Sequence, residues 1–215
     1  MGIQVWEDLD AQPVTEVVIT TETPEVSAVT DIANCDWPEI KAMVAQCQRC
    51  ELAATRTQAV FGAGNPNADL LVIGEAPGQE EDAQGEPFVG EAGQLLTAML
   101  KAIDQPREAV YITNILKCHP PGNRDPLPEE IENCHTFLRR QIALLQPKVI
   151  YTVGRVASQV LLNSEESISK LREHQHSFQG VPLIASYHPA YLLRKPSEKR
   201  KAWHDLQQLK KLLEA

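Results

Sequence analysis

The sequence contains no run of 18 apolar residues, and aromatic residues make up only 5% of its 215 residues. A helix that spans a membrane needs about 20 consecutive apolar residues. The first ten residues, MGIQVWEDLD, also lack the basic and apolar regions of a secretory signal. We therefore expect a cytoplasmic protein without a membrane partner. Its hydrophobic content of 43% is ordinary for a chain with a packed core.

Residues 1–36 contain no Lys or Arg, although they contain eight acidic residues. Since the whole chain has 29 acidic and 20 basic residues, 37–215 keeps 21 acidic against 20 basic residues and is almost neutral. The first segment is rich in Thr, Val, Glu and Pro and shows no helical period. It is predicted to be a disordered acidic leader, and 37–215 is predicted to form one domain.

Basic residues gather near the other end of the chain, where few acidic residues accompany them. They are Arg194, Lys195, Lys199, Arg200, Lys201, Lys210 and Lys211. Such a region can follow a phosphate backbone. A solvated helix face has the same composition, so charge alone leaves both interpretations open.

Apolar runs alternate with helical patterns from residue 37 onward, a pattern that predicts crossover units and parallel strands. We expect an α/β fold with a central four-stranded parallel sheet, flanked by helices on both faces. The predicted strands are 69–73, 109–113, 148–153 and 182–186, and the predicted helices are 37–47, 92–103, 128–145, 155–162 and 198–213.

Polar residues follow three of these strands. Glu75 comes after the first strand in GEAPG, Asn114 after the second in YITN, and His188 after the fourth in SYHPAY. Ligands of open α/β sheets bind beyond the carboxyl ends of the strands. Each residue alone has an ordinary explanation as a turn, a cap or a loop residue, but three at equivalent positions predict a ligand site.

The loop after the first strand, GEAPGQ, fits neither common phosphate-binding glycine pattern and carries a carboxylate where a phosphate would lie. It offers backbone N–H groups, and Phe88 follows a few residues later, fixed behind Pro87. This combination favours a flat, neutral, hydrogen-bonding ligand such as a nucleobase stacked on an aromatic ring.

Four of the five cysteines form two pairs. Cys47 and Cys50 lie in CQRC, and Cys118 and Cys134 follow as a wider pair, whereas Cys35 has no evident partner. In a chain without a secretory signal, such pairs favour a metal centre over disulfides. Zinc prefers two close pairs, and iron–sulfur clusters accept wider spacing. A redox-active CxxC is the remaining alternative.

Taken together, GEAPGQEEDAQGEPFVGEAGQLL, YITNILKCHPPGNRDP, YHPAYLLR and the cysteine spacing resemble the family 4 uracil-DNA glycosylases, which are iron–sulfur proteins. The resemblance covers about 37–213. A neighbouring family of the superfamily has Gln where this chain has Ala76, and it carries a basic, His-containing insertion after the second motif. PPGNRDP runs on without such an insertion, so family 4 is the better match.

The resemblance implies that uracil is flipped out of DNA and stacked on Phe88. The amide of Asn114 would read its O4 and N3–H edge. Backbone groups of Gly74, Glu75 and Ala76 would line its O2 side.

Three further roles follow from the same resemblance. His188 would stabilise the negative charge that develops on O2, and Glu75 would support the cationic sugar or the attacking water. Glu81 would screen the 5-position of the base. The motifs further imply that Leu192 and Leu193 are candidates for a wedge in the base stack and that Arg194 and Lys195 face phosphates.

The resemblance also implies one 4Fe–4S cluster, held by Cys47, Cys50, Cys118 and Cys134. The expected partner is uracil-containing DNA, single- or double-stranded, and the expected state is a monomer. Two rival hypotheses remain: an iron–sulfur module that binds nucleic acid without excision, and a zinc-stabilised hydrolase of a small substrate. The second lacks a GxSxG motif.

Overall fold

The computed structural model describes residues 31–215, so most of the predicted acidic leader lies outside the described residues. Its last residues are packed onto the rest of the chain. Ile32 and Cys35 are buried beside Phe61 and Phe137, and the Arg140 guanidinium donates a hydrogen bond of 2.6 Å to the carbonyl of Cys35. The compact unit of the described chain therefore begins at residue 31, ahead of the expected boundary at residue 36.

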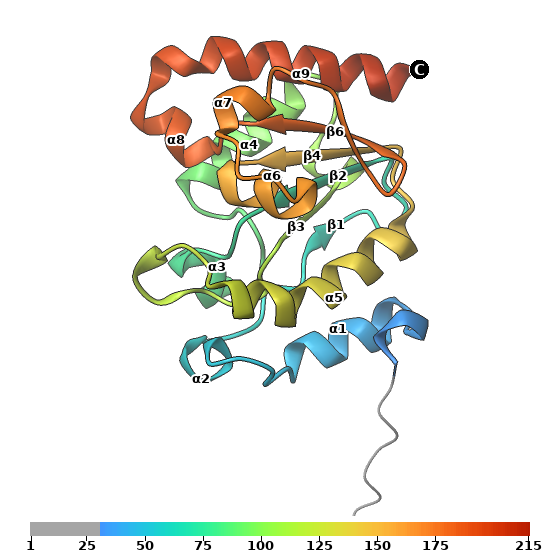
Figure 1. The fold of residues 1–215 in the computed structure, drawn as a ribbon, viewed down its shortest axis with the longest axis vertical. Helices are drawn as coiled ribbons and strands as arrows, with labels where there is room; N and C mark the ends of the chain where they lie inside the picture. Colours follow the sequence, from blue (N-terminus) through green and yellow to red (C-terminus); the bar gives the residue numbers. More distant parts are fainter. Residues whose placement is uncertain (1–30) are drawn as a thin grey trace, which may run out of the picture. The chain divides into compact units, whose positions relative to one another are not determined.

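The sheet has six strands in the order β1-β3-β2-β4-β6-β5 (Figure 1). The four predicted strands are its parallel centre, and the bounds are β2 (Leu70–Gly74), β3 (Tyr111–Asn114), β4 (Val149–Val153) and β6 (Val181–Ser186). Two short antiparallel strands, β1 (Ala63–Gly64) and β5 (His176–Phe178), extend its edges. The prediction of a four-stranded parallel sheet therefore missed β1 and β5. Strands of two or three residues at an exposed edge have no apolar run that a sequence pattern could reveal.

Each central strand is buried on both faces, which explains why it has a continuous apolar run instead of an alternating one. In β2, Leu70 and Val72 pack on one face, and Leu71 and Ile73 pack on the other. Burial of such side chains contributes about 1.5–3 kcal/mol each. The two cores hold the carboxyl ends of all four parallel strands at one edge.

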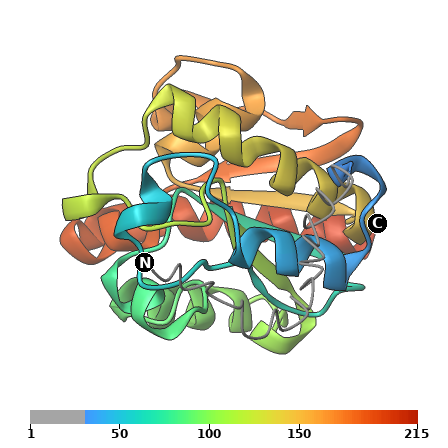
Figure 2. The same cartoon turned by 90° about the horizontal axis from the view of Figure 1, so that it is seen from below.

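Helices cover both faces of the sheet, as the sequence predicted. One face packs against α4 (Glu91–Lys101), α8 (Pro189–Arg194) and α9 (Lys199–Glu214), and the other against α5 (Pro128–Leu145), α6 (Arg155–Leu162) and α7 (Ile168–Leu171). Figure 2 shows α5 and α4 on opposite sides of the strands. Within residues 31–215, no helix combines the length and the apolar character needed to cross a membrane.

Helix α1 (Trp37–Ala45) packs against α5, and the sequence explains where it begins. The Asp36 side chain accepts a hydrogen bond from the Glu39 N–H, and the Glu39 side chain accepts one from the Asp36 N–H. This capping box satisfies two N–H groups that the first turn leaves free. The remaining short helical segments are η1 (Ile32–Asn34), α2 (Leu52–Thr55), α3 (Gln79–Gln84), η2 (Arg107–Ala109), η3 (Pro121–Asn123) and η4 (Pro196–Glu198).

Candidate active site and cysteine centre

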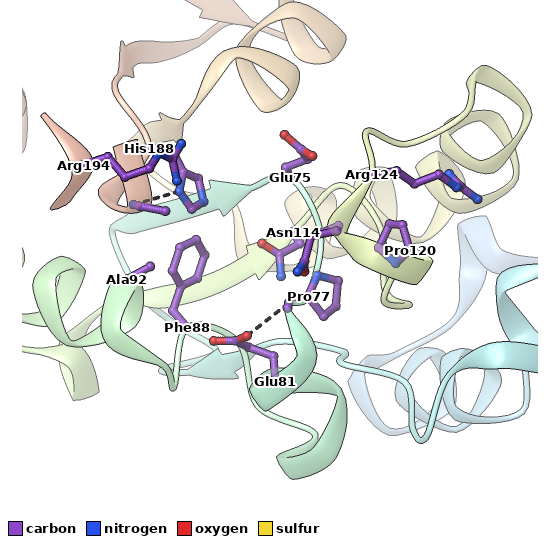
Figure 3. Close-up of a pocket in the computed structure, with 14 residues that line it drawn as sticks. Glu75, Pro77, Glu81, Phe88, Ala92, Asn114, Pro120, Arg124, His188 and Arg194 are labelled. Carbon is purple, nitrogen blue, oxygen red and sulfur yellow. Dashed lines mark hydrogen bonds between the residues drawn. The ribbon is translucent and has the colours of Figure 1, made fainter. Parts of the chain in front are cut away.

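A cavity of about 480 Å³ opens at the carboxyl ends of the parallel strands (Figure 3). Glu75, Asn114 and His188 all line it, so the three strand-end residues converge as predicted. The complete lining is Glu75, Ala76, Pro77, Gly78, Glu81, Phe88, Ala92, Asn114, Pro120, Asn123, Arg124, His188, Ala190 and Arg194. A drug-sized or nucleobase-sized ligand fits a cavity of this volume.

Phe88 forms one wall of the cavity and is held there by its backbone. Its φ of 54° lies in the left-handed region, which a bulky residue seldom adopts. The Arg107 guanidinium donates hydrogen bonds to the carbonyls of Pro87 and Phe88, the second at 3.1 Å. The ring lies nearly parallel to the His188 imidazole, with 5.7 Å between centroids and 29° between planes. The aromatic wall is therefore fixed before any ligand binds.

Glu81 joins the two loops that carry this wall. Its Oε1 accepts hydrogen bonds from the N–H groups of Val89 and Gly90, at 2.8 and 3.1 Å, and its Oε2 accepts one of 3.1 Å from Gly78 (Figure 3). All three contacts are to main-chain donors, so the carboxylate clamps the start of α3 to the Phe88 loop. This structural function explains the position of Glu81 independently of any contact with a base.

Asn114 ends β3 and is almost completely buried, with 1% of its surface exposed. Among the described residues, its Oδ1 has no hydrogen-bond partner although it is buried. A side chain at Gly74 would begin 2.4 Å from this oxygen and 2.6 Å from the Phe88 ring, so Gly74 is required here for space. An unpaired buried acceptor costs about 1–3 kcal/mol, which a ligand N–H would recover.

His188 caps α8 and presents one ring nitrogen to the cavity. The Ala190 N–H donates a hydrogen bond of 3.1 Å to Nδ1, so Nδ1 carries no proton and the neutral ring carries its proton on Nε2. Burial, with the nearby positive charge of Arg194, lowers the pKa of His188 to about 4. The residue is thus a neutral N–H donor near pH 7.

Glu75 lies at the end of β2, on the rim of the cavity. Burial raises the pKa of this carboxyl group above its usual value of 4.5. The negative charge of Asp125 raises this pKa further, and the positive charge of Arg155 opposes the rise. Arg155 and Asp125 are themselves paired at 2.5 Å. Ala76 and Gly78 beside Glu75 complete the loop that lines the cavity.

The residues predicted to contact DNA occupy helix α8 and its end. Leu192 is 1% exposed and packs in the core against α4 and α9, so it is not available as a wedge. Leu193 is 40% exposed. Arg194 lines the cavity, and the Lys195 ammonium lies 5.7 Å over the Tyr191 ring. Of the two leucines, only Leu193 faces outward.

The four paired cysteines meet in a second, smaller cavity, although they come from the loop after α1, the loop after β3 and helix α5. Cys47, Cys50, Cys118 and Cys134 all line it, and Cys35 lies apart, buried beside α1. Among residues 31–215, no three His, Cys, Asp or Glu side chains are placed to hold a single metal ion. Four thiols that face one space are the donor set of a cubic iron–sulfur cluster.

Cationic groups surround these thiols. Burial raises the pKa of Cys50 and Cys118 and raises that of Cys134 to about 11. The Arg56 guanidinium donates a hydrogen bond of 2.9 Å to Cys118 Sγ and others to the carbonyls of Ala45 and Cys47. Such donors stabilise thiolates, the form that binds iron, so the residues present fit an iron–sulfur cluster.

Several lining residues were not singled out from the sequence, above all Arg124. Its guanidinium extends away from the cavity centre (Figure 3) and makes a bidentate pair with the buried Glu130, at 2.6 and 2.9 Å. The Leu127 N–H also donates to Glu130, so the pair anchors the loop before α5. The PPGNRDP motif was the available signal, but it did not show which residue would face the cavity.

Comparison with known proteins agrees with this arrangement of fold and site. A sequence model of the uracil DNA glycosylase superfamily matches residues 61–207, which include the strands that form the cavity and the residues that line it. The class of protein is therefore that superfamily of base-excising enzymes.

Curated relatives narrow the assignment. A type-4 uracil-DNA glycosylase of Archaeoglobus fulgidus is 43% identical, over 81% of this chain and 92% of its own length. A type-4 uracil-DNA glycosylase of Thermotoga maritima is 42% identical, over 74% of this chain and 83% of its own length. A type-5 uracil-DNA glycosylase of Thermus thermophilus is 33% identical, over 60% of this chain and 68% of its own length. The chain belongs to the type-4 uracil-DNA glycosylases, which confirms the family expected from the motifs.

Proposed function

We propose that this protein excises uracil from DNA in base excision repair and that the strand-end cavity performs the reaction. It is a uracil-DNA glycosylase by family. The observation that carries the site assignment is the buried Oδ1 of Asn114, which has no hydrogen-bond partner within residues 31–215 and shares its cavity with a neutral histidine donor and an aromatic wall. This combination matches the edges and the face of one pyrimidine.

The base is read by Asn114 and Phe88. Uracil presents a donor at N3 and an acceptor at O4, so Oδ1 of Asn114 accepts from N3–H and its Nδ2 donates to O4. Cytosine has an acceptor at N3 and a donor at N4, which would leave Oδ1 unpaired. The base stacks on Phe88, and the main chain from Gly74 to Ala76 lies along its O2 side. A site of this kind discriminates strongly, because the wrong partner strands buried polar atoms.

The reaction breaks the bond between N1 of uracil and C1′ of the sugar, and the bonding electrons go to the base. Negative charge then develops on O2, where the Nε2–H of His188 donates a hydrogen bond. Because this proton is already in place and the ring is neutral, the group acts as a preorganised donor. The Ala190 N–H at Nδ1 fixes that tautomer.

Glu75 acts on the sugar side. After departure of the base, C1′ carries positive charge and is attacked by water, which loses one proton. A carboxylate at the cavity rim stabilises this cation and accepts the proton. The neighbouring residue is Ala76, so Glu75 is the acidic group that the loop places nearest to the reaction.

The outer surface of α8 meets the DNA. Leu193, exposed at 40%, fills the space that the flipped nucleotide leaves, and Arg194 and Lys195 bind flanking phosphates. The protein acts on single- or double-stranded DNA as a monomer. Membership of the family favours uracil excision over both rival hypotheses, the binding module without excision and the small-substrate hydrolase.

The four cysteines hold one 4Fe–4S cluster. Cys47, Cys50, Cys118 and Cys134 supply the thiolates, and Arg56 stabilises their negative charge. These cysteines come from the loop after α1, the loop after β3 and α5, so a bound cluster would stabilise the fold around the base-reading strand.

An excision assay tests the function directly. Oligonucleotides with a single uracil should be converted to abasic products, whereas matched thymine and cytosine oligonucleotides should remain intact. Asn114→Ala should reduce single-turnover excision by at least about 100-fold, because the pairing edge of uracil loses its partner. His188→Ala should reduce it by about 100-fold, the effect of removing one donor to a developing anion.

DNA that contains an abasic-site mimic provides the control for both variants. It has no base to read, so each variant should bind it with an affinity within about twofold of wild type. If both variants excised uracil at the wild-type rate, the reaction would occur at a site other than this cavity. Binding of DNA by the wild type without excision would restore the binding-module hypothesis.

Metal analysis tests the cofactor. Protein purified without oxygen should be brown and carry about four iron and four sulfide per chain. Cys118→Ser should lose iron and stability together, whereas Cys35→Ser should retain the iron. One zinc per chain without sulfide would contradict the cluster.

A further inference from the structure

Lys117 is a buried lysine that the reaction described above does not use. Its side chain is almost completely enclosed, with 1% of the residue exposed. The ammonium donates hydrogen bonds to Thr113 Oγ1 at 2.6 Å and to the carbonyl oxygen of Asn114 at 2.8 Å. One end of this residue therefore holds the main chain of the base-reading asparagine.

The other end of Lys117 belongs to the cysteine centre. Its main-chain N–H donates a hydrogen bond of 3.3 Å to Cys134 Sγ, and the residue lines the cavity of the four cysteines. Its carbonyl accepts a hydrogen bond of 2.8 Å from the Val60 N–H, which fixes the backbone between the two sites. A single residue thus contacts a cysteine thiol and the Asn114 peptide.

The main chain and side chain of Lys117 connect the two ends. Burial of an ammonium group is very unfavourable unless hydrogen-bond partners compensate for the lost water. Thr113 Oγ1 and the Asn114 carbonyl are such partners, at 2.6 and 2.8 Å, and Cys134 Sγ contacts the Lys117 main chain from the other side. The position of the cysteine centre therefore affects the Asn114 carbonyl through one residue.

Strand β2 also supports the Asn114 main chain, through the pairing of Gly74 with Asn114 and a hydrogen bond of 2.9 Å from the Ile115 N–H to the Gly74 carbonyl. The restraint by Lys117 matters because the amide is positioned mainly through that main chain. Among the described residues, no side chain pairs with its Oδ1, and the amide fits closely against Gly74 and Phe88. Its orientation depends on the position of its own main chain at the end of β3. A small shift of that peptide moves the amide away from N3–H and O4 of the base.

We propose that Lys117 is a positioning residue that links the iron–sulfur centre to Asn114, so that base recognition depends on the cysteine centre. The inference rests on the proposed function of Asn114. It assigns the buried lysine to recognition of uracil and not to contact with the DNA backbone.

The test compares Lys117→Met with Lys148→Met. The first change keeps much of the side-chain length and removes the ammonium. The second is a matched control at an exposed lysine that pairs with Asp69 at the opposite end of β2 and β4. For each protein we would measure affinity for free uracil, affinity for abasic-site DNA, iron content and melting temperature.

Lys117→Met should weaken free-uracil binding by at least about fivefold, within the range of energetic coupling between linked sites. Its affinity for abasic-site DNA should stay within about twofold of wild type in the iron-loaded fraction. Lys148→Met should resemble wild type in every measurement. A general loss of folding would lower both affinities together, so the split between them identifies a positioning effect.

Thr113→Val provides a second test that leaves the lysine and all thiolates in place. It removes one partner of the ammonium, while the Phe61 carbonyl keeps its hydrogen bond from Gln141. Iron content should be unchanged, and uracil affinity should fall by a smaller factor. If either iron-loaded variant bound uracil with wild-type affinity, the proposed role of Lys117 in positioning Asn114 would be wrong. If the wild type itself neither excised nor bound uracil, the proposed function would fail instead.

Discussion

At the scale of single residues, the site is built from groups whose protonation is set by burial. His188 and Glu75 line one cavity, but burial shifts their pKa values in opposite directions, because it disfavours the charged form of each. The pKa of the histidine falls to about 4, and that of the carboxyl group rises above 4.5. The acid that titrates first as the pH falls from 7 is therefore Glu75.

The pH dependence of excision follows from this order. Single-turnover excision should decline as the pH falls through a value above 4.5, because Glu75 gains a proton and loses its charge. His188 should stay neutral over the same range. In Glu75→Gln the rate should be lower and this decline should disappear. Rates measured from pH 4.5 to 8 provide the check, and an unchanged acid limb in Glu75→Gln would assign it to another group.

Residue types at the strand ends could be predicted from sequence, but the network behind them could not. The rule that ligands bind beyond parallel strands placed Glu75, Asn114 and His188 together because it depends only on topology. The sequence analysis did not single out Lys117. Its burial depends on partners from three separate segments, and a single sequence does not show such contacts.

At the scale of elements, helix α9 is hydrogen-bonded to the end of β6, two residues before His188. Asp205 of α9 accepts hydrogen bonds from Ser186 at 2.7 Å and from the Arg172 guanidinium at 2.5 and 3.1 Å. The side chains of Asp205 and Arg172 are 0% and 9% exposed. Ser186 is two residues before His188, so this pair anchors the strand end that carries the donor.

Asp205→Ala should lower the free energy of unfolding by about 3–5 kcal/mol, because it leaves the buried Arg172 charge without its carboxylate partner. Asp104→Ala is the matched control: it removes a carboxylate that pairs with Lys210 of α9, but Asp104 is 82% exposed. That change should cost less than about 1 kcal/mol. Urea denaturation would measure the free energy of unfolding of both variants. Similar decreases in the two would contradict the view that the Asp205–Arg172 pair anchors the end of β6.

Element prediction from sequence succeeded where burial was complete. The four central strands and the helices α4, α5, α6 and α9 match the expected ranges within a few residues, because their apolar patterns reflect packing on both faces. The edge strands β1 and β5 were missed, since β1 has two residues, neither of them buried, and β5 has three, only partly buried. Helix α8 was not among the predicted helices, and its helical turn is what places Leu192 in the core.

At the scale of the whole molecule, charge is divided unequally along the chain. Residues 1–30 contain six of the 29 acidic residues and no Lys or Arg, so their removal would change the net charge from −9 to −3. Residues 31–36 are packed on the body, which makes residue 30 the appropriate place to cut.

Deletion of residues 1–30 should strengthen binding to abasic-site DNA at low salt, because it removes negative charge without altering the described domain. The gain should shrink as the salt concentration rises, since the Debye length falls to about 10 Å at 0.1 M. Titrations at two salt concentrations would measure this. Equal affinity of both proteins at low salt would place the leader's charge outside the influence of the DNA surface.

The convergence of Glu75, Asn114 and His188 also makes the cavity depend on the long-range folding of the sheet. These residues are far apart in the chain and meet only when β2, β3 and β6 share one sheet. Contacts of such long sequence separation form late, because closing long loops costs entropy. In the proposed mechanism, a chain that lacks β6 would have no donor for the departing base, so excision of uracil would require the completed sheet.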